Sequence, residues 1–325
     1  MGGTGALLAR DAGDVRIGPV TKASTSLHPL LGEDGTEPCA WLFVVPFRSR
    51  STRARRVPVA EVRNGNVRIS YDLIGHGRPL VLLHGWSVDR TSWAGAGYID
   101  QLKTDHRLVN IDIRGHGESD KPHEAGAYTA ELLVGDVSAV ADAEGLDEFA
   151  IWGHSYGGWI AWMTASADSE RVAAIVTSGA WDPRPELDQS RPQEEVEVLK
   201  QGGARALLEW WKSEGGERFD REFPPWIQAT TLRADPEALQ ASFSQMWRTG
   251  IADNELESFP VPALLIAGEL EDEGDGAAEV AARIPDGRRL RLGDLGHAGT
   301  CNASTLTVPT ARAFLAERMG SQDPA

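Results

Sequence analysis

From Val57 onwards, continuous apolar runs alternate with segments whose apolar residues recur at helical spacing. The runs PLVLLHG (79–85) and HRLVNIDIRG (106–115) are typical of strands that are buried on both faces. Residues 127–145 show helical spacing and end in glycine, the usual helix stop. Strands that alternate with helices in this way form a parallel sheet with helices on both faces. The sequence therefore predicts an α/β protein.

The remaining predicted strands continue this pattern around one interruption. VPVAEV and NVRISYDL are predicted strands joined by Asn64-Gly65-Asn66, a hairpin turn signal. EFAIWG and RVAAIVTSG are predicted strands separated by the helical segment YGGWIAWMTASA, and the alternation resumes at VPALLIAGE. We expect four parts: an N-terminal extension (1–56), the first part of a core (57–182), a helical insertion (183–259) and the second part of the core (260–320).

The predicted N-terminal extension differs from the rest of the chain in charge. Residues 1–56 carry eight basic and five acidic residues, whereas the whole chain of 325 residues has a net charge of −16. They also lack sustained periodicity. We interpret them as a flexible extension whose removal leaves the melting temperature and turnover intact; a transit peptide or an anchor for an anionic surface is the alternative.

Composition and charge exclude several classes of protein. With 41% hydrophobic and 25% charged residues, the chain is an ordinary globular one. Its acidic balance repels phosphate backbones, which argues against a nucleic-acid partner. Two cysteines are too few for a disulfide framework or a Cys-rich metal site, and the apolar run at 39–47 is far shorter than the roughly 20 residues that span a bilayer. We expect a cytoplasmic protein without membrane contact that acts on a small molecule; homo-oligomerisation is left open.

The strongest chemical signal is GHSYGG, which lies between the predicted strand EFAIW and an apolar helix. Gly153-His154-Ser155-Tyr156-Gly157 fits the pattern G-x-S-x-G, in which a tight strand-to-helix turn exposes a serine hydroxyl above the sheet. The two glycines lack side chains that would collide with neighbouring elements. A turn with a spectator serine is the alternative reading, but the flanking strand and helix favour Ser155 as a nucleophile.

A serine hydroxyl attacks efficiently only when a base removes its proton. The chain contains eight histidines, and His297, in LGHAGT, is the one that follows the last predicted strand. The loop that carries it leaves the carboxyl end of the sheet, where ligands bind in open α/β folds. We therefore predict that His297 is the general base for Ser155.

A carboxylate should orient the imidazole and stabilise its charged form. In the chain order Ser, acid, His, the candidates follow the strand that ends at Gly268. We favour Glu271, with Asp272 as the alternative acid. Asp182, which follows an earlier strand, is a further candidate.

The anionic intermediate of acyl transfer needs backbone N–H donors. Tyr156 directly follows the serine and begins a predicted helix, whose dipole also favours negative charge. We expect the second donor in the loop after PLVLLHG and favour the N–H of Trp86; a simple packing turn at His84-Gly85-Trp86 is the alternative.

Four motifs together resemble the α/β-hydrolase superfamily: HGW (84–86), DIRGHGESD (112–120), GHSYGG and LGHAGT. The resemblance covers about residues 59–319. It implies an α/β fold with a mostly parallel, eight-stranded sheet flanked by helices. It also implies a mobile helical cap inserted after the sixth strand, at residues 183–259.

The same resemblance implies a triad of Ser155, an acid and His297, with the oxyanion donors on Trp86 and Tyr156. The acid position of this family, the fourth residue of a G-x-x-D pattern, falls on Glu271, where aspartate is usual. The longer side chain is a departure that bears on the geometry. The resemblance implies no metal and no cofactor.

The expected activity follows from the serine, because the haloalkane dehalogenase and epoxide hydrolase branches of this superfamily use aspartate in its place. We expect a carboxylesterase-type serine hydrolase that cleaves esters of small apolar or aromatic substrates through an acyl-enzyme. A C–C bond hydrolase or lactonase with the same triad is one alternative, and a non-catalytic ligand-binding protein is another. The predicted cap and its entrance are rich in aromatic residues, which either fill the core of the cap or line an apolar pocket: Trp181, Trp210, Trp211, Phe219, Phe223, Trp226, Phe243 and Trp247.

Overall fold

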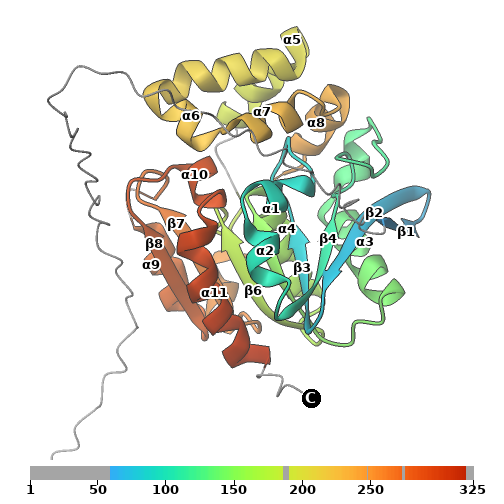
Figure 1. The fold of residues 1–325 in the computed structure, drawn as a ribbon, viewed down its shortest axis with the longest axis vertical. Helices are drawn as coiled ribbons and strands as arrows, with labels where there is room; N and C mark the ends of the chain where they lie inside the picture. The colour runs from blue at the N-terminus through green and yellow to red at the C-terminus, as the bar shows by residue number, and fades with distance from the viewer. Residues whose placement is uncertain (1–58, 186–189, 247, 273–274, 320–325) are drawn as a thin grey trace, which may run out of the picture. The chain divides into compact units, whose positions relative to one another are not determined.

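A computed structural model describes residues 59–185, 190–246, 248–272 and 275–319. The predicted N-terminal extension and Trp247 lie outside these ranges. The described residues belong to one compact unit, built around an eight-stranded sheet of order β1-β2-β4-β3-β5-β6-β7-β8 (Figure 1). The strands are β1 (Val59–Asn64), β2 (Val67–Gly75), β3 (Arg78–Leu83), β4 (His106–Ile111), β5 (Phe149–His154), β6 (Val172–Ser178), β7 (Ala263–Gly268) and β8 (Gly287–Leu292).

The sheet is mostly parallel. β1 and β2 form an antiparallel hairpin, and β2 also runs antiparallel to β4, whereas the five pairings from β4–β3 through β7–β8 are parallel. Parallel strands carry their carboxyl ends to one edge, so β3, β5 and β7 all end there. The predicted α/β fold with eight strands is confirmed.

Helices cover both faces of the sheet because its central strands are apolar on both sides. On one face, α3 and α4 pack their buried residues against Val81, Leu83 and Ile151; on the other, α2 and α11 pack against Leu80 and Leu82. Adjacent residues of β3 therefore point to opposite faces of the sheet, as successive side chains of a strand do. The α-helices of the core are α1 (Thr91–Gly95), α2 (Tyr98–Leu102), α3 (Ala130–Ala143), α4 (Tyr156–Ala167), α9 (Gly276–Arg283), α10 (His297–Cys301) and α11 (Ser304–Met319).

Among the described residues, four further α-helices lie between β6 and β7 and stand beyond the carboxyl edge of the sheet (Figure 1). This is the helical insertion after the sixth strand that the sequence predicted. The longest of the four is interrupted at Gly203, whose φ of 64° and ψ of −160° are not helical, so a single helical pattern in the sequence corresponds to two helical stretches. The four helices are α5 (Ser190–Gly215), α6 (Phe219–Glu222), α7 (Pro225–Thr231) and α8 (Pro236–Phe243).

The turn after β4 is closed by a buried carboxylate. Asp112 is fully buried, accepts hydrogen bonds from the backbone N–H groups of Arg90 and Glu118 at 2.7 Å each, and pairs with the Arg90 guanidinium. A Cβ on Gly117 would collide with this carboxylate, which accounts for the glycine. Asp112 thus holds the DIRGHGESD turn in place.

Among the described helices, none combines the length and the apolar character that a membrane crossing requires.

Candidate active site

Ser155 lies on a strained turn between β5 and α4. Its φ of 50° and ψ of −113° are a backbone conformation that a non-glycine residue rarely adopts, and such conformations collect at functional sites. The turn is possible because the residues two positions before and two positions after Ser155 are glycines. A Cβ on Gly153 would lie 2.2 Å from the carbonyl oxygen of Gly157, and a Cβ on Gly157 would lie 2.2 Å from that of Leu83.

This crowding predicts the effect of one methyl group. Gly157→Ala is expected to lower the free energy of unfolding by about 1–3 kcal/mol, because the new Cβ overlaps the backbone at the end of β3. Equilibrium urea denaturation measures this change. Gly126→Ala is the matched control, since no atom lies within 4 Å of a Cβ built there. Equal stability of the two variants would contradict the packing that we describe.

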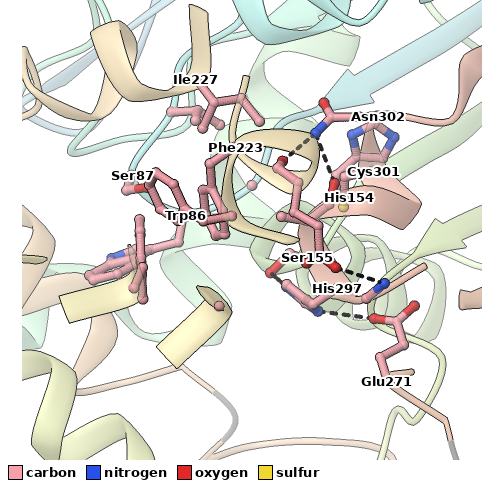
Figure 2. Close-up of a pocket in the computed structure, with 18 of the residues that line it drawn as sticks. Trp86, Ser87, His154, Ser155, Phe223, Ile227, Glu271, His297, Cys301 and Asn302 are labelled. Carbon is pink, nitrogen blue, oxygen red and sulfur yellow. Dashed lines mark hydrogen bonds and ion pairs between the residues drawn. The ribbon is translucent and has the colours of Figure 1, made fainter. Parts of the chain in front are cut away.

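The structure brings Ser155, His297 and Glu271 together in one hydrogen-bonded chain (Figure 2). His297 Nε2 lies 2.8 Å from Ser155 Oγ, and His297 Nδ1 lies 3.2 Å from Glu271 Oε2. The other carboxylate oxygen of Glu271 accepts the N–H of Gly268 at 2.8 Å. The glutamate is thereby fixed at the end of β7, with its longer side chain folded back onto the strand that it follows.

The two other candidate acids point elsewhere. Asp272 is buried and accepts hydrogen bonds from the N–H groups of Gly276 and Ala277, at 2.6 and 3.1 Å. It therefore caps the start of α9. Asp182 pairs with Arg184 at 2.7 Å. Of the three acids, Glu271 is the one that contacts the imidazole.

The position of His297 differs from the sequence prediction in one respect. The residue is not in an open loop but is the first residue of the short helix α10. Its side chain is 53% exposed, on the surface that lines the cavity described below. Desolvation within the cavity lowers the pKa of His297, but the hydrogen bond to Glu271 and the negative charges of Glu271, Glu195 and Glu222 together raise this pKa above its usual value.

The two predicted oxyanion donors flank the serine. Tyr156 follows it at the start of α4, and Trp86 follows Gly85, where an added Cβ would lie 3.7 Å from the Ser155 Cβ. Within the part of the chain that the structure describes, neither backbone N–H donates to another protein group. Neither N–H is therefore committed to a protein acceptor in these ranges.

A cavity of about 880 Å³ lies above Ser155, between the sheet edge and the inserted helices. The aromatic residues that the sequence singled out divide between two roles. Trp210 packs against the small apolar cluster inside the insertion, and Trp181 packs against the core. The other described members of that group line the cavity together with Trp86: Trp211, Phe219, Phe223, Trp226 and Phe243. Figure 2 labels Trp86 and Phe223 among them.

Two residues near the serine were not identified as site residues from the sequence. His154 stacks on Trp93 with ring centroids 3.9 Å apart and lines the cavity; burial and the nearby His297 and His84 lower its pKa to about 3, so it is neutral. Glu222, at the end of α6, lines the cavity and contacts the chain beside His297. The pattern of the sequence gave no signal for Glu222, because α6 is only four residues long.

A mostly parallel eight-stranded sheet, a serine on a strained strand-to-helix turn and a helical insertion after β6 define the architecture of the α/β hydrolases. The chain belongs to this family: residues 78–299 match the family described as alpha/beta hydrolase fold.

Individual relatives agree with this assignment. The putative 2-succinyl-6-hydroxy-2,4-cyclohexadiene-1-carboxylate synthase of Bacillus subtilis is 27% identical over 231 residues, which are 67% of this chain and 83% of that protein. A thermophilic esterase from Thermogutta terrifontis superposes with a TM-score of 0.69 at 21% identity, over 80% of this chain and 98% of its own. The enol-lactonase of Burkholderia xenovorans superposes with a TM-score of 0.67 at 22% identity, over 79% and 99%. These two structures establish the fold.

Proposed function

We propose that the protein is a serine hydrolase of carboxylic esters. The observation that carries this proposal is the hydrogen-bonded chain from Ser155 through His297 to Glu271 at the floor of the cavity. In the neutral tautomer with the proton on Nδ1, the imidazole donates to Glu271 and accepts from the Ser155 hydroxyl. This is the arrangement that activates a serine for attack.

The proposed reaction proceeds in two stages. The Ser155 oxygen attacks the ester carbonyl carbon while His297 takes the hydroxyl proton, and the N–H groups of Trp86 and Tyr156 stabilise the resulting oxyanion. The tetrahedral intermediate collapses to an acyl-enzyme, and the alcohol leaves with the proton from His297. Water, deprotonated by the same imidazole, then attacks the acyl carbon. The bond to the Ser155 oxygen breaks, that oxygen takes the proton back from His297, and the carboxylic acid leaves.

The cavity supports an apolar or aromatic substrate. Its cap side is formed by indole and phenyl rings, and two of these, Trp86 and Phe243, lie with their centroids 4.3 Å apart. Such a surface binds acyl chains and aromatic rings through burial and ring contacts. Ile227 and Met246 extend the apolar lining.

The charge of the cavity further narrows the substrate class. Besides Glu271, the charged lining residues are Glu195, Glu214, Glu222 and Arg218, so acidic groups predominate. A cavity of this sign repels a substrate that carries a carboxylate. We therefore propose neutral acyl groups as the preferred substrates.

A pair of matched esters tests this preference. The kcat/KM for p-nitrophenyl butyrate is expected to exceed that for the p-nitrophenyl half-ester of succinate by roughly 10- to 100-fold at low salt. Added salt should reduce this ratio of kcat/KM values, because it screens the repulsion between the acidic cavity and the carboxylate of the half-ester. Glu214→Gln should reduce the ratio at low salt. A half-ester that is hydrolysed as well as the butyrate would overturn the proposed charge selectivity.

The pH dependence of turnover tests the role of His297. Only the neutral imidazole can accept the serine proton, so kcat/KM should fall as the pH drops through its raised pKa. The acid limb is therefore expected above about 6.5, the pKa of an unperturbed imidazole. The titratable groups that interact with this imidazole are Glu271, Glu195, Glu222 and His154. An acid limb well below the unperturbed value would contradict the assigned base.

A lactonase or C–C bond hydrolase is the second candidate function. The likeness to the enol-lactonase favours the lactonase form, and the same triad serves either reaction. Parallel assays with a neutral aromatic ester, a neutral aromatic lactone and a vinylogous diketone from ring fission separate the candidates by kcat/KM. A ligand-binding protein without catalysis would turn over none of them, and a fluorophosphonate probe would leave Ser155 unlabelled.

A further inference from the structure

The short helix α6 of the insertion contacts the chain on both sides of His297. Before it, the N–H of Gly296 donates to Glu222 Oε1 at 3.1 Å. After it, Asn302 Nδ2 donates to the Glu222 carbonyl oxygen at 2.9 Å and also to the carbonyl oxygen of Ala298, at 2.9 Å. Glu222 therefore holds both ends of α10 through its side chain and its backbone (Figure 2 labels Asn302 and His297 in this region).

A second contact lies one residue away on the same helix. Arg221 Nη1 lies 2.9 Å from Asp294 Oδ2, and Arg221 Nη2 donates to the Asp294 carbonyl oxygen at 2.9 Å. Asp294 has a φ of 50°, so the chain turns sharply just before it reaches His297. These contacts are exposed, whereas those of Glu222 are partly buried, and the latter therefore hold the chain more firmly.

The glycine before His297 leaves room for the Glu222 carboxylate. A Cβ on Gly296 would lie 2.5 and 2.7 Å from the two carboxylate oxygens of Glu222. The backbone of Gly296 is in an ordinary extended conformation, with φ of −90°, so backbone strain does not explain the residue. A side chain at this position would displace the Glu222 carboxylate from the Gly296 N–H.

The Glu222 carboxylate also supplies a hydrogen-bond acceptor at the start of α10. Gly296 is the N-cap residue of this helix and has no side chain to cap it, so the first N–H groups need an acceptor from elsewhere. Glu222 provides one, and its negative charge is favourable beside the start of a helix. A side chain from the insertion therefore contacts the start of α10, where His297 lies.

We propose that Glu222 is a positioning residue, through which α6 holds the His297 imidazole in line with the Ser155 hydroxyl. The kinetic effect of this inference rests on the proposed function. The contact between Glu222 and the start of α10 is independent of it. If the inference is correct, the inserted helices do more than enclose the substrate: they complete the alignment of the base.

Three variants distinguish the effect of Glu222 on the position of His297 from the effect of its negative charge. Glu222→Ala removes both the acceptor and the charge, Glu222→Gln keeps an acceptor oxygen but removes the charge, and Asp220→Ala is the control on the same helix, at an exposed residue that does not line the cavity. Each is measured in the full-length chain by kcat and KM for p-nitrophenyl butyrate against pH. The rate of Ser155 labelling by a fluorophosphonate and the hydrogen exchange of residues 294–302 complete the set.

Glu222→Ala is expected to lower kcat and the labelling rate by roughly 10- to 100-fold, because small displacements of a catalytic group have effects of this size. KM should change little, and exchange of 294–302 should accelerate. Glu222→Gln should restore kcat at high pH and protection from exchange, with its acid limb moved to lower pH, because this carboxylate raises the pKa of His297. Asp220→Ala should match the wild type.

Two results would overturn the proposal. One is a Glu222→Ala variant with wild-type kcat, labelling and exchange, whatever its melting temperature. The other is a Glu222→Gln variant as impaired as Glu222→Ala at every pH. Failure of the proposed function looks different: the wild type would then hydrolyse no ester, while exchange of 294–302 would still respond to Glu222→Ala and recover in Glu222→Gln.

Discussion

Ser155→Ala is expected to lower kcat/KM for p-nitrophenyl butyrate by about 10⁴-fold or more, because loss of the nucleophile disables the whole triad at once. The variant should fold normally. Alanine has the same Cβ as serine, and the Ser155 N–H that donates to the Ser178 carbonyl oxygen at 2.8 Å is retained. Steady-state kinetics measure the loss, and thermal unfolding serves as the control for folding.

Covalent labelling gives an independent measure of the same residue. Wild-type protein should react with a fluorophosphonate probe at a single site, and mass spectrometry of the peptide that contains residue 155 should locate it. Undiminished ester turnover by Ser155→Ala, or labelling at a different serine, would exclude the proposed nucleophile.

The second large effect is expected at the acid. Glu271→Gln should lower kcat by roughly 10²- to 10⁴-fold, since a neutral amide neither stabilises the imidazolium nor fixes the Nδ1–H tautomer. It should also move the acid limb of kcat/KM to lower pH, because the hydrogen bond to Glu271 raises the pKa of His297. A pH series of kcat and kcat/KM measures both changes.

The neighbouring aspartate provides the matched control. Asp272→Ala removes the cap of α9 and is expected to destabilise the fold by about 1 kcal/mol, with kcat close to that of the wild type. Since the two acids are adjacent in sequence and differ in what they contact, the pair distinguishes catalysis from stability. A greater loss of kcat in Asp272→Ala than in Glu271→Gln would reverse our assignment.

Much of the core could be predicted from the sequence because its signals are local. The apolar runs of β3 and β5 have few interpretations other than buried strands, and glycines around Ser155 indicate a turn that only small residues permit. Chain order then places the base and the acid at the ends of neighbouring strands. The hydrogen bonds of His297 to Ser155 and Glu271 agree with this reasoning.

The choice between the two acids could not be made from sequence. Glu271 and Asp272 follow the same strand, and what separates them is the direction in which the chain turns after Gly268. That turn directs Asp272 towards the start of α9 and Glu271 towards the cavity. An aspartate is usual at this position of the family, but the glutamate reaches the imidazole here because its carboxylate folds back onto the Gly268 N–H.

The contacts between the inserted helices and the core could not be predicted from the sequence for a different reason. Glu222 and Gly296 are 74 residues apart, and α6 is too short to show a periodic pattern. Their contact depends on how the inserted helices are seated on the core, which is a property of packing between distant segments. The same is true of α10, which the sequence indicated only as a loop.

Trp86 has its main chain beside the serine and its indole in the insertion, where Nε1 donates to the Leu239 carbonyl oxygen at 3.2 Å and to Ser242 Oγ at 3.3 Å. Suppose that the segment between β6 and β7 is exchanged for that of another hydrolase. The chimaera would then lose these two hydrogen bonds of Trp86 as well as the residues of the insertion that line the cavity. Engineers who aim to alter selectivity by such an exchange should transplant Trp86 and its two acceptors as one module.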